Sequence, residues 1–151
     1  MTCVLDTAGV YTRAMQVYLA AAMTNPDRDL ATVRRFLAAI EAHGHTVPTR
    51  HVADPGGKAA DRALTDAELA RRDLAWLAAS DALVAEVSAP SHGVGVEVMA
   101  ALARALPVLL LRREGAAVSR LLLGLPGVAA VAYRDADEGC AAIAAFLGAP
   151  A

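Results

Sequence analysis

The feature that most constrains the fold of this chain is its alternation of short apolar runs with segments of helical periodicity. Five runs are compact enough to form strands, and they span residues 15–23, 45–53, 81–87, 107–113 and 128–134. Parallel neighbours in a sheet need crossover connections, which helices usually provide. The alternation therefore predicts a mostly parallel sheet that is covered by helices on both faces.

Five strands joined by right-handed crossovers fit an α/β, flavodoxin-like (Rossmann-like) three-layer fold with sheet order 2-1-3-4-5. Pro48 lies inside the second run, so we expect that strand to be an edge strand or to be broken. Ligands of such sheets bind beyond the carboxyl ends of the strands, near the switch point between the first and third strands. The loops after Ala22 and Val87 are therefore expected to line the site.

Local signals predict where the helices begin and end. Thr65 and Glu68 form the capping-box pattern TDAE, which predicts a helix that runs to about Ser80. Residues 54–63 are rich in Gly, Pro and charged residues, and this composition predicts a loop. Another helix is expected over residues 94–106, directly after the glycine-containing segment SAPSHGVG.

Length and charge restrict the class of protein. The chain has 151 residues, which can bury the core of one domain, and we expect that domain over residues 15–151. Residues 1–14 are expected to form a poorly ordered leader. The net charge of −2 argues against a nucleic-acid polymer as partner. Because the sequence has neither a membrane-spanning apolar stretch nor a signal-peptide pattern, we expect no membrane association and a cytoplasmic location.

Glu97 stands out because it is a single acid at the front of an otherwise apolar helix. The loop before it contains Ser91, Gly93 and Gly95, small residues that let backbone amides approach an anion. A carboxylate beside an anion site repels the anion, so we expect Glu97 to have a separate task, such as attack on a nearby carbon. The structural alternative is a favourable contact with the helix dipole.

Asp73 is the second acid in an unusual position. Leu69, Trp76 and Leu77 lie one turn to either side of it, which places Asp73 in or beside the stripe that faces the sheet. Half-buried carboxylates usually accept structural hydrogen bonds. Together with Glu97, however, Asp73 matches the layout for cleaving a bond at an anomeric carbon, in which one acid attacks and the other acts on the leaving group.

Other polar residues carry weaker signals. Tyr18 would place a phenol near the same sheet edge, with plain strand packing as the alternative. No pair of histidines, His51 and His92 included, has the spacing of metal ligands, so we predict no metal. The segment GVGVEV matches only half of a dinucleotide-binding fingerprint and follows the third strand instead of the first. We therefore predict no cofactor.

Four segments together resemble the 2'-deoxynucleoside 5'-monophosphate N-hydrolases, which are close relatives of the nucleoside 2-deoxyribosyltransferases. These segments are YLAAAM, RHVA, RRDLAWLAASDALVAEVSAPSHGVGVEV and VSRLLLG, between about Tyr18 and Gly124. The most specific part is the central block, where DLAWL, AEV and PSHGVGVE keep the order and spacing of the family. The resemblance implies a flavodoxin-like fold, a homodimer with sites near the subunit interface, and cleavage of the N-glycosidic bond of a nucleotide.

The resemblance also implies roles for individual residues. By position, Glu97 would be the nucleophile, Asp73 would act near the leaving base, and Tyr18 would orient Glu97 and contact the sugar. We further expect the helix amino terminus to favour ionised Glu97, and partial burial to keep a proton on Asp73 near neutral pH. Attack by the carboxylate would give a glycosyl ester that water then hydrolyses.

The remaining roles concern substrate binding. The resemblance assigns Ser91 and the backbone near Gly93 to the 5'-phosphate, and Ser119 to the phosphate site of the partner subunit. Trp76 matches a family tryptophan one turn after the acid, and His51 matches a histidine near the substrate.

One loop departs from the family pattern. Ala21, Ala22 and Thr24 stand where the family commonly has a Gly-Ser pair and a phosphate-binding arginine, and Arg28 is a candidate substitute for that arginine. Two alternatives to hydrolysis stay open, and the altered loop supports the second of them. The first is a deoxyribosyltransferase that moves the sugar between bases, and the second is a catalytically silent nucleotide-binding module.

Overall fold

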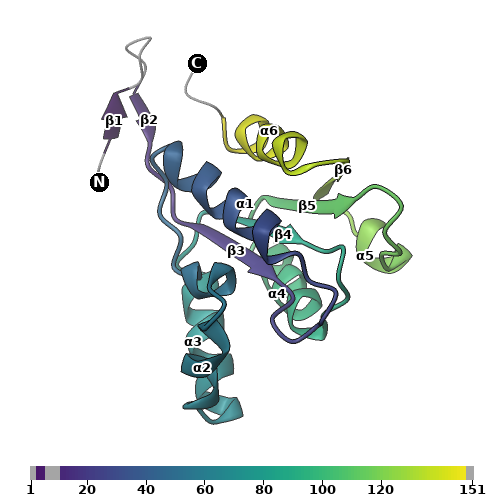
Figure 1. Cartoon of the computed structure of the whole chain (residues 1–151). Helices are drawn as coiled ribbons and strands as arrows, with labels where there is room; N and C mark the ends of the chain where they lie inside the picture. The colour runs from purple at the N-terminus through teal and green to yellow at the C-terminus, as the bar shows by residue number, and fades with distance from the viewer. Residues whose placement is uncertain (1–2, 6–10, 149–151) are drawn as a thin grey trace.

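The computed structural model describes residues 3–5 and 11–148. Its centre is a parallel sheet of four strands in the order β3-β4-β5-β6 (Figure 1). The strands are β3 (Val17–Ala21), β4 (Ala82–Glu86), β5 (Val108–Arg113) and β6 (Val128–Tyr133). All residues of β3 and β4 are buried, as is typical of parallel strands that helices cover on both faces.

Helices form a layer on each face of this sheet (Figure 1). One layer contains α1 (Leu30–Ala42) and α6 (Ala136–Leu147), and the other contains α3 (Asp66–Ala78) and α4 (His92–Ala103). Successive side chains of a strand point to opposite faces, so β3 contributes to both cores. Leu19 packs in the core under α1 and α6, whereas Tyr18 packs under α3 and α4. The predicted α/β class with helices on both faces is therefore confirmed.

The prediction of five strands in the order 2-1-3-4-5 is wrong, because residues 45–53 do not form a second strand. Thr46 makes one isolated parallel bridge with Gln16, and the chain then turns into the 3-10 helix η1 (Arg50–Ala53). Pro48 has no N–H group to continue a ladder. Instead, the Thr49 hydroxyl accepts a hydrogen bond from the Leu19 N–H (3.1 Å) and donates one to the Leu19 carbonyl (2.7 Å). A side chain thus replaces a neighbouring strand at the edge of β3.

Near the site, one helix was not expected and another begins earlier than expected. Residues 54–63 were expected to be a loop, but they contain the short helix α2 (Gly57–Arg62). Gly57 makes this possible, because a Cβ at that position would lie 2.0 Å from the His51 carbonyl oxygen. Helix α4 begins at His92 instead of residue 94, with Ser91 as its N-cap. In contrast, the capping box of Thr65 and Glu68 is present as predicted at the start of α3.

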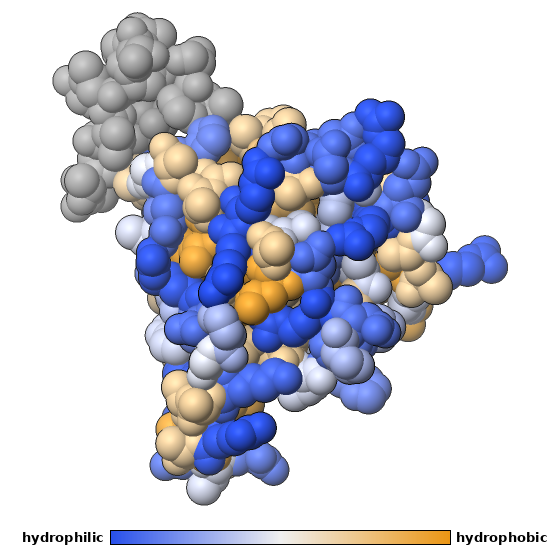
Figure 2. All heavy atoms as spheres, viewed as in Figure 1, coloured by the Kyte–Doolittle hydropathy of each residue, from blue (hydrophilic) through white to orange (hydrophobic). Residues whose placement is uncertain are grey.

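The N-terminal segment forms a small sheet of its own. Strands β1 (Cys3–Leu5) and β2 (Tyr11–Arg13) pair antiparallel within the expected leader, apart from the main sheet (Figure 1). Residues 1–2 and 6–10 of that leader lie outside the described residues. On the face shown in Figure 2, small apolar patches alternate with hydrophilic side chains. Within the described part of the chain, no helix combines the length and the hydropathy that a membrane span requires.

Candidate active site

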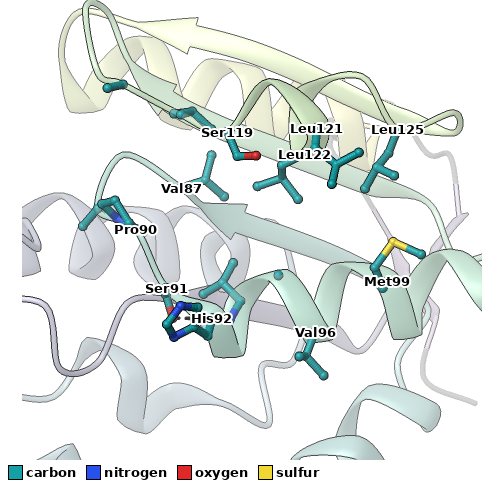
Figure 3. A pocket seen from close by; sticks show the side chains of 15 residues that line it. Val87, Pro90, Ser91, His92, Val96, Met99, Ser119, Leu121, Leu122 and Leu125 are labelled. Carbon is teal, nitrogen blue, oxygen red and sulfur yellow. Dashed lines mark hydrogen bonds between the residues drawn. The ribbon is translucent and has the colours of Figure 1, made fainter.

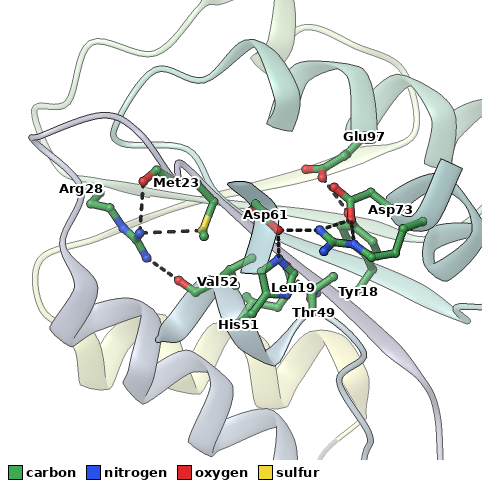
Figure 4. A network of polar contacts seen from close by, with 11 residues as sticks. Tyr18, Leu19, Met23, Arg28, Thr49, His51, Val52, Asp61, Asp73 and Glu97 are labelled. Atoms are coloured by element: carbon green, nitrogen blue, oxygen red, sulfur yellow. Dashed lines mark hydrogen bonds and ion pairs between the residues drawn. The ribbon is translucent and has the colours of Figure 1, made fainter. Parts of the chain in front are cut away.

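Three elements bring Tyr18, Asp73 and Glu97 together. Tyr18 is the second residue of β3, and its hydroxyl donates a hydrogen bond of 2.6 Å to Glu97 Oε1 on α4. Helix α3 packs against α4 and brings Asp73 close enough for its charge to act on both other side chains (Figure 4). The two acids that are far apart in sequence therefore meet at one place, as the sequence predicted.

Burial controls the charge of Glu97. Desolvation raises the pKa of Glu97 to about 7; the Tyr18 hydrogen bond acts in the opposite direction, and the nearby Asp73 raises the pKa further. Burial therefore opposes the ionised form of Glu97 that the helix amino terminus is expected to favour. Because α4 begins at His92, Glu97 lies beyond its first turn, where the favourable field of the helix end has weakened. Desolvation and the neighbouring Glu97 raise the pKa of Tyr18 well above its usual value, so the phenol stays a donor.

Asp73 is paired with the guanidinium of Arg72. Arg72 Nε donates to Asp73 Oδ1 at 2.9 Å, and Arg72 Nη2 lies 2.8 Å from the same oxygen. Arg72 Nη2 also donates to Asp61 Oδ1 at 2.8 Å. Arg72 therefore bridges Asp61 and Asp73, and Asp73 Oδ1 is the acceptor at one end.

Arg72 and Asp61 are site residues that the sequence did not predict. Adjacent helix residues do not face each other, so the position of Arg72 next to Asp73 gave no reason to expect a contact. Asp61 belongs to α2, which the composition of its segment predicted to be a loop. The basic residue directly before the candidate acid was the one available signal.

His51 and Trp76 join the same group of side chains. Their ring centroids are 5.7 Å apart, and Arg72 Cζ lies 4.6 Å from the Trp76 ring centroid. His51 Nε2 lies 3.8 Å from Asp61 Oδ1, while burial lowers the pKa of His51 and favours its neutral form. We name this group the Glu97 cluster; it comprises Tyr18, His51, Asp61, Arg72, Asp73, Trp76 and Glu97.

Three of the expected phosphate-binding residues line a cavity beside α4. Ser91 and Ser119 line an apolar cavity of about 830 Å³ between α4 and the short helix α5 (Arg120–Leu123), as Figure 3 shows. Gly95 lines the same cavity, whereas Gly93 lies in the first turn of α4. The other walls are mainly apolar and include Val87, Pro90, Val94, Val96, Met99, Leu121, Leu122 and Leu125.

The two glycines of α4 have open space around them. A Cβ at Gly95 would meet no atom within 4 Å, and a Cβ at Gly93 would meet only the Ser91 Oγ, at 3.8 Å. The packing of this chain therefore does not require glycine at either position. The exposed backbone that glycines provide is consistent with an approaching ligand or a second chain.

Arg28, the candidate substitute for the missing arginine, contacts backbone carbonyls on two segments of the chain. Its guanidinium donates to the Met23 carbonyl at 3.3 Å and to the Val52 carbonyl, and it lies apart from Glu97 (Figure 4). It therefore ties the loop after β3 to η1. Among residues 3–5 and 11–148, no group of three or more His, Cys, Asp or Glu residues is arranged to hold a metal ion.

Comparison with known proteins shows the family of this chain. The family model described as nucleoside 2-deoxyribosyltransferase matches residues 17–142, which include Tyr18, Asp73 and Glu97. The chain belongs to this family. The family resemblance that the sequence motifs predicted is thereby confirmed.

Members of the nucleoside 2-deoxyribosyltransferase family with related sequences carry hydrolase names. A Thermofilum pendens protein named 2'-deoxynucleoside 5'-phosphate N-hydrolase 1 is 42% identical over 128 residues, which cover 82% of this chain and 89% of that protein. The mouse 5-hydroxymethyl-dUMP N-hydrolase is 37% identical over 114 residues, covering 72% of this chain and 64% of that protein.

One solved structure supports the fold of this family member. A Clostridium botulinum CMP N-glycosidase superposes with a TM-score of 0.66 and covers 87% of this chain and 98% of its own. The two sequences are 18% identical, so this similarity concerns the fold alone.

Proposed function

We propose that this chain hydrolyses the N-glycosidic bond of nucleoside 5'-monophosphates, of the 2'-deoxy class, to a free base and a sugar 5-phosphate. The observation that carries the proposal is the 2.6 Å hydrogen bond from Tyr18 to Glu97 beside Asp73, in a chain whose relatives are named nucleotide N-hydrolases. A carboxylate next to a second acid is the arrangement that glycosidic cleavage needs.

Glu97 is the nucleophile in this proposal. Its Oε1 accepts the Tyr18 hydrogen bond, so Oε2 is the oxygen that attacks the anomeric carbon. The carbon–nitrogen bond breaks, its electron pair leaves with the base, and a glycosyl ester of Glu97 forms. Water then attacks the anomeric carbon of the ester: its hydroxyl stays on the sugar, its proton goes to the departed base, and Glu97 is released as a carboxylate. Asp73 meets the departing base through the oxygen that Arg72 does not occupy.

The 5'-phosphate is proposed to bind at the start of α4. There, the Ser91 hydroxyl and the backbone N–H groups around Gly93 would contact the phosphate. The positive end of the α4 dipole favours an anion at this position. Ala21, Ala22 and Thr24 offer no positive charge at the neighbouring loop, so this chain makes one charge-assisted phosphate contact fewer than the family pattern implies.

A second copy of the chain is proposed to cover the apolar cavity. Val96, Met99 and Leu121 are 61%, 51% and 79% exposed, which is unusual for large apolar side chains that lie together. Ser119 stands on the α5 wall opposite Ser91 on the α4 wall (Figure 3). In a homodimer through this face, Ser119 would reach the phosphate site of the neighbouring subunit.

The test is a panel of ribo- and deoxyribonucleoside monophosphates, with free base measured by chromatography. We expect free base and sugar phosphate in a 1:1 ratio. Formation of a new nucleoside after addition of a second base would favour the deoxyribosyltransferase alternative. Binding of every nucleotide without release of base would favour the catalytically silent module, whose support is the altered loop at Ala21, Ala22 and Thr24.

A further inference from the structure

The Glu97 cluster contains an ion-pair network that the proposed reaction does not yet explain. Arg72 joins Asp61 of α2 to Asp73 of α3, with Nη2 2.8 Å from an oxygen of each carboxylate. The side chains of all three residues are 21% exposed. The network is therefore accessible to solvent and to a ligand, and it is not a buried structural pair.

Helix geometry alone does not produce the contact between Arg72 and Asp73. Neighbouring positions on an α-helix project about 100° apart, so their side chains do not face each other. Two groups restrain the guanidinium of Arg72: Asp61 binds it from another helix, and the Trp76 ring lies 4.6 Å from its Cζ. Without Asp61, a long and flexible side chain would lose its one restraint from outside α3 within this network.

We propose that Asp61 is a positioning residue for the reaction: it holds Arg72 against Asp73 and thereby fixes the direction in which Asp73 presents its second oxygen. This inference rests on the proposed function, because it assumes that Asp73 meets the departing base. Arg72 occupies Asp73 Oδ1 with two nitrogens, so Oδ2 is the oxygen that can turn to a substrate. The same contacts direct the guanidinium to Asp73, while Glu97 Oε1 is held by Tyr18.

The neighbouring titratable groups do not take over this task. His51 of η1 lies 3.8 Å from Asp61, but burial lowers the pKa of His51 and favours its neutral form. Tyr18 of β3 and Glu97 of α4 contact each other. Among the described residues, Arg72 is the only lysine or arginine that pairs with Asp61 or Asp73.

A double-mutant cycle tests whether Asp61 acts through Arg72. Asp61→Asn removes one charge with little change in shape, and Arg72→Gln removes the guanidinium. We expect each single variant to lower kcat about tenfold and to change KM less than about threefold. The double variant should be no slower than the slower single variant, because both changes break the same link. Losses that multiply in the double variant would overturn the proposal.

Two further variants separate positioning from folding. Asp61→Glu keeps the charge and should recover most of the lost kcat. Asp66→Asn is the matched control, because it removes an exposed Asp at the start of α3 outside the network, and it should keep the kcat of the wild type. If Asp61→Asn and Asp66→Asn lower kcat equally, the role of Asp61 is a general charge effect and the proposal is wrong.

A second measurement does not depend on activity. In the wild type, Arg72 Nε–H donates to Asp73, so its nitrogen-15 NMR signal should exchange slowly with water. Exchange should accelerate several-fold in Asp61→Asn and stay unchanged in Asp66→Asn. Absence of base release by the wild type would refute the proposed function, whereas unchanged exchange in Asp61→Asn would refute the positioning role.

Discussion

Two sides of α4 show how a single helix can serve two tasks. Glu97 points into its polar cluster and contacts Tyr18. Its neighbour Val96, together with Met99, lines the apolar cavity toward α5. Because adjacent helix residues project about 100° apart, one step along the sequence separates the proposed chemistry from the proposed subunit contact.

Each side of α4 is energetically unfavourable in the isolated chain, for a different reason. On the cluster side, burial disfavours the charged form of Glu97. On the cavity side, Val96 and Met99 expose apolar surface to water. Unfavourable features of this kind are expected where a substrate or a second chain completes the structure. If this interpretation is correct, changes on the two sides of α4 should have separable effects.

The largest expected effect comes from removal of the carboxylate on the cluster side. Glu97→Gln should lower kcat by about a thousandfold or more, because the amide does not attack the anomeric carbon, while nucleotide binding persists. Single-turnover base release and calorimetric binding would measure the two quantities. Glu114→Gln removes an exposed Glu elsewhere and should behave like the wild type. Turnover by Glu97→Gln at the original rate would exclude Glu97 as the nucleophile.

A charge on the cavity side should act through assembly. Val96→Arg and Leu121→Arg place a cation in the proposed interface, so we expect monomers and a loss of kcat/KM of about tenfold, since Ser119 no longer reaches its neighbour. Light scattering and activity would be measured at matched concentrations. Leu74→Arg is the control, because Leu74 is 44% exposed but lies outside the cavity lining. Dimers of both interface variants would contradict the assignment of this face.

The pH dependence of kcat/KM tests the ionisation of Glu97 on the cluster side of α4. A nucleophile must be ionised, and the pKa of Glu97 is raised to about 7 by burial, so kcat/KM should rise about tenfold from pH 6 to pH 8. The substrate phosphate also titrates near pH 6, which makes a control necessary. The Tyr18 hydrogen bond lowers the pKa of Glu97, so Tyr18→Phe should move the acid limb to higher pH. A limb that stays in place would belong to the phosphate.

The last expected effect concerns stability instead of activity. The pKa of Glu97 rises from 4.5 to about 7 on folding, so the folded state binds more protons between these values, and stability falls as pH rises through that window. Glu97→Gln removes this loss and should be more stable than the wild type by up to about 3 kcal/mol at pH 8, with no such gain at pH 4. Urea denaturation at both pH values would measure it. An equal change at both values would show that the charge of Glu97 has no part in stability.

Local patterns predicted the elements well, and tertiary contacts explain where they failed. The capping box at Thr65 depends on neighbours in the chain, and it is present as predicted. Residues 45–53 have the apolar content of a strand, but the Thr49 hydroxyl satisfies the edge of β3 in its place. Such a contact joins residues far apart in sequence, so no local pattern reveals it.

The candidate site divides in the same way. Its residue types were visible in the motifs around Asp73 and Glu97, whereas the surroundings of these two side chains were not. The pKa of Glu97 depends on burial, and the partner of Asp73 depends on a guanidinium that Asp61 holds from another helix. Neither the pKa of Glu97 nor the partner of Asp73 follows from the position of these residues on their own helices.

By itself, the sequence determined the class of fold, the family and the residues that meet at the site, because alternating periodicity and motif spacing are properties of the chain order. Only the tertiary structure decided that the sheet has four strands, that Glu97 has the raised pKa, and that Asp73 is paired with Arg72. These depend on desolvation and on contacts between distant segments, and both come into existence only when the chain has folded.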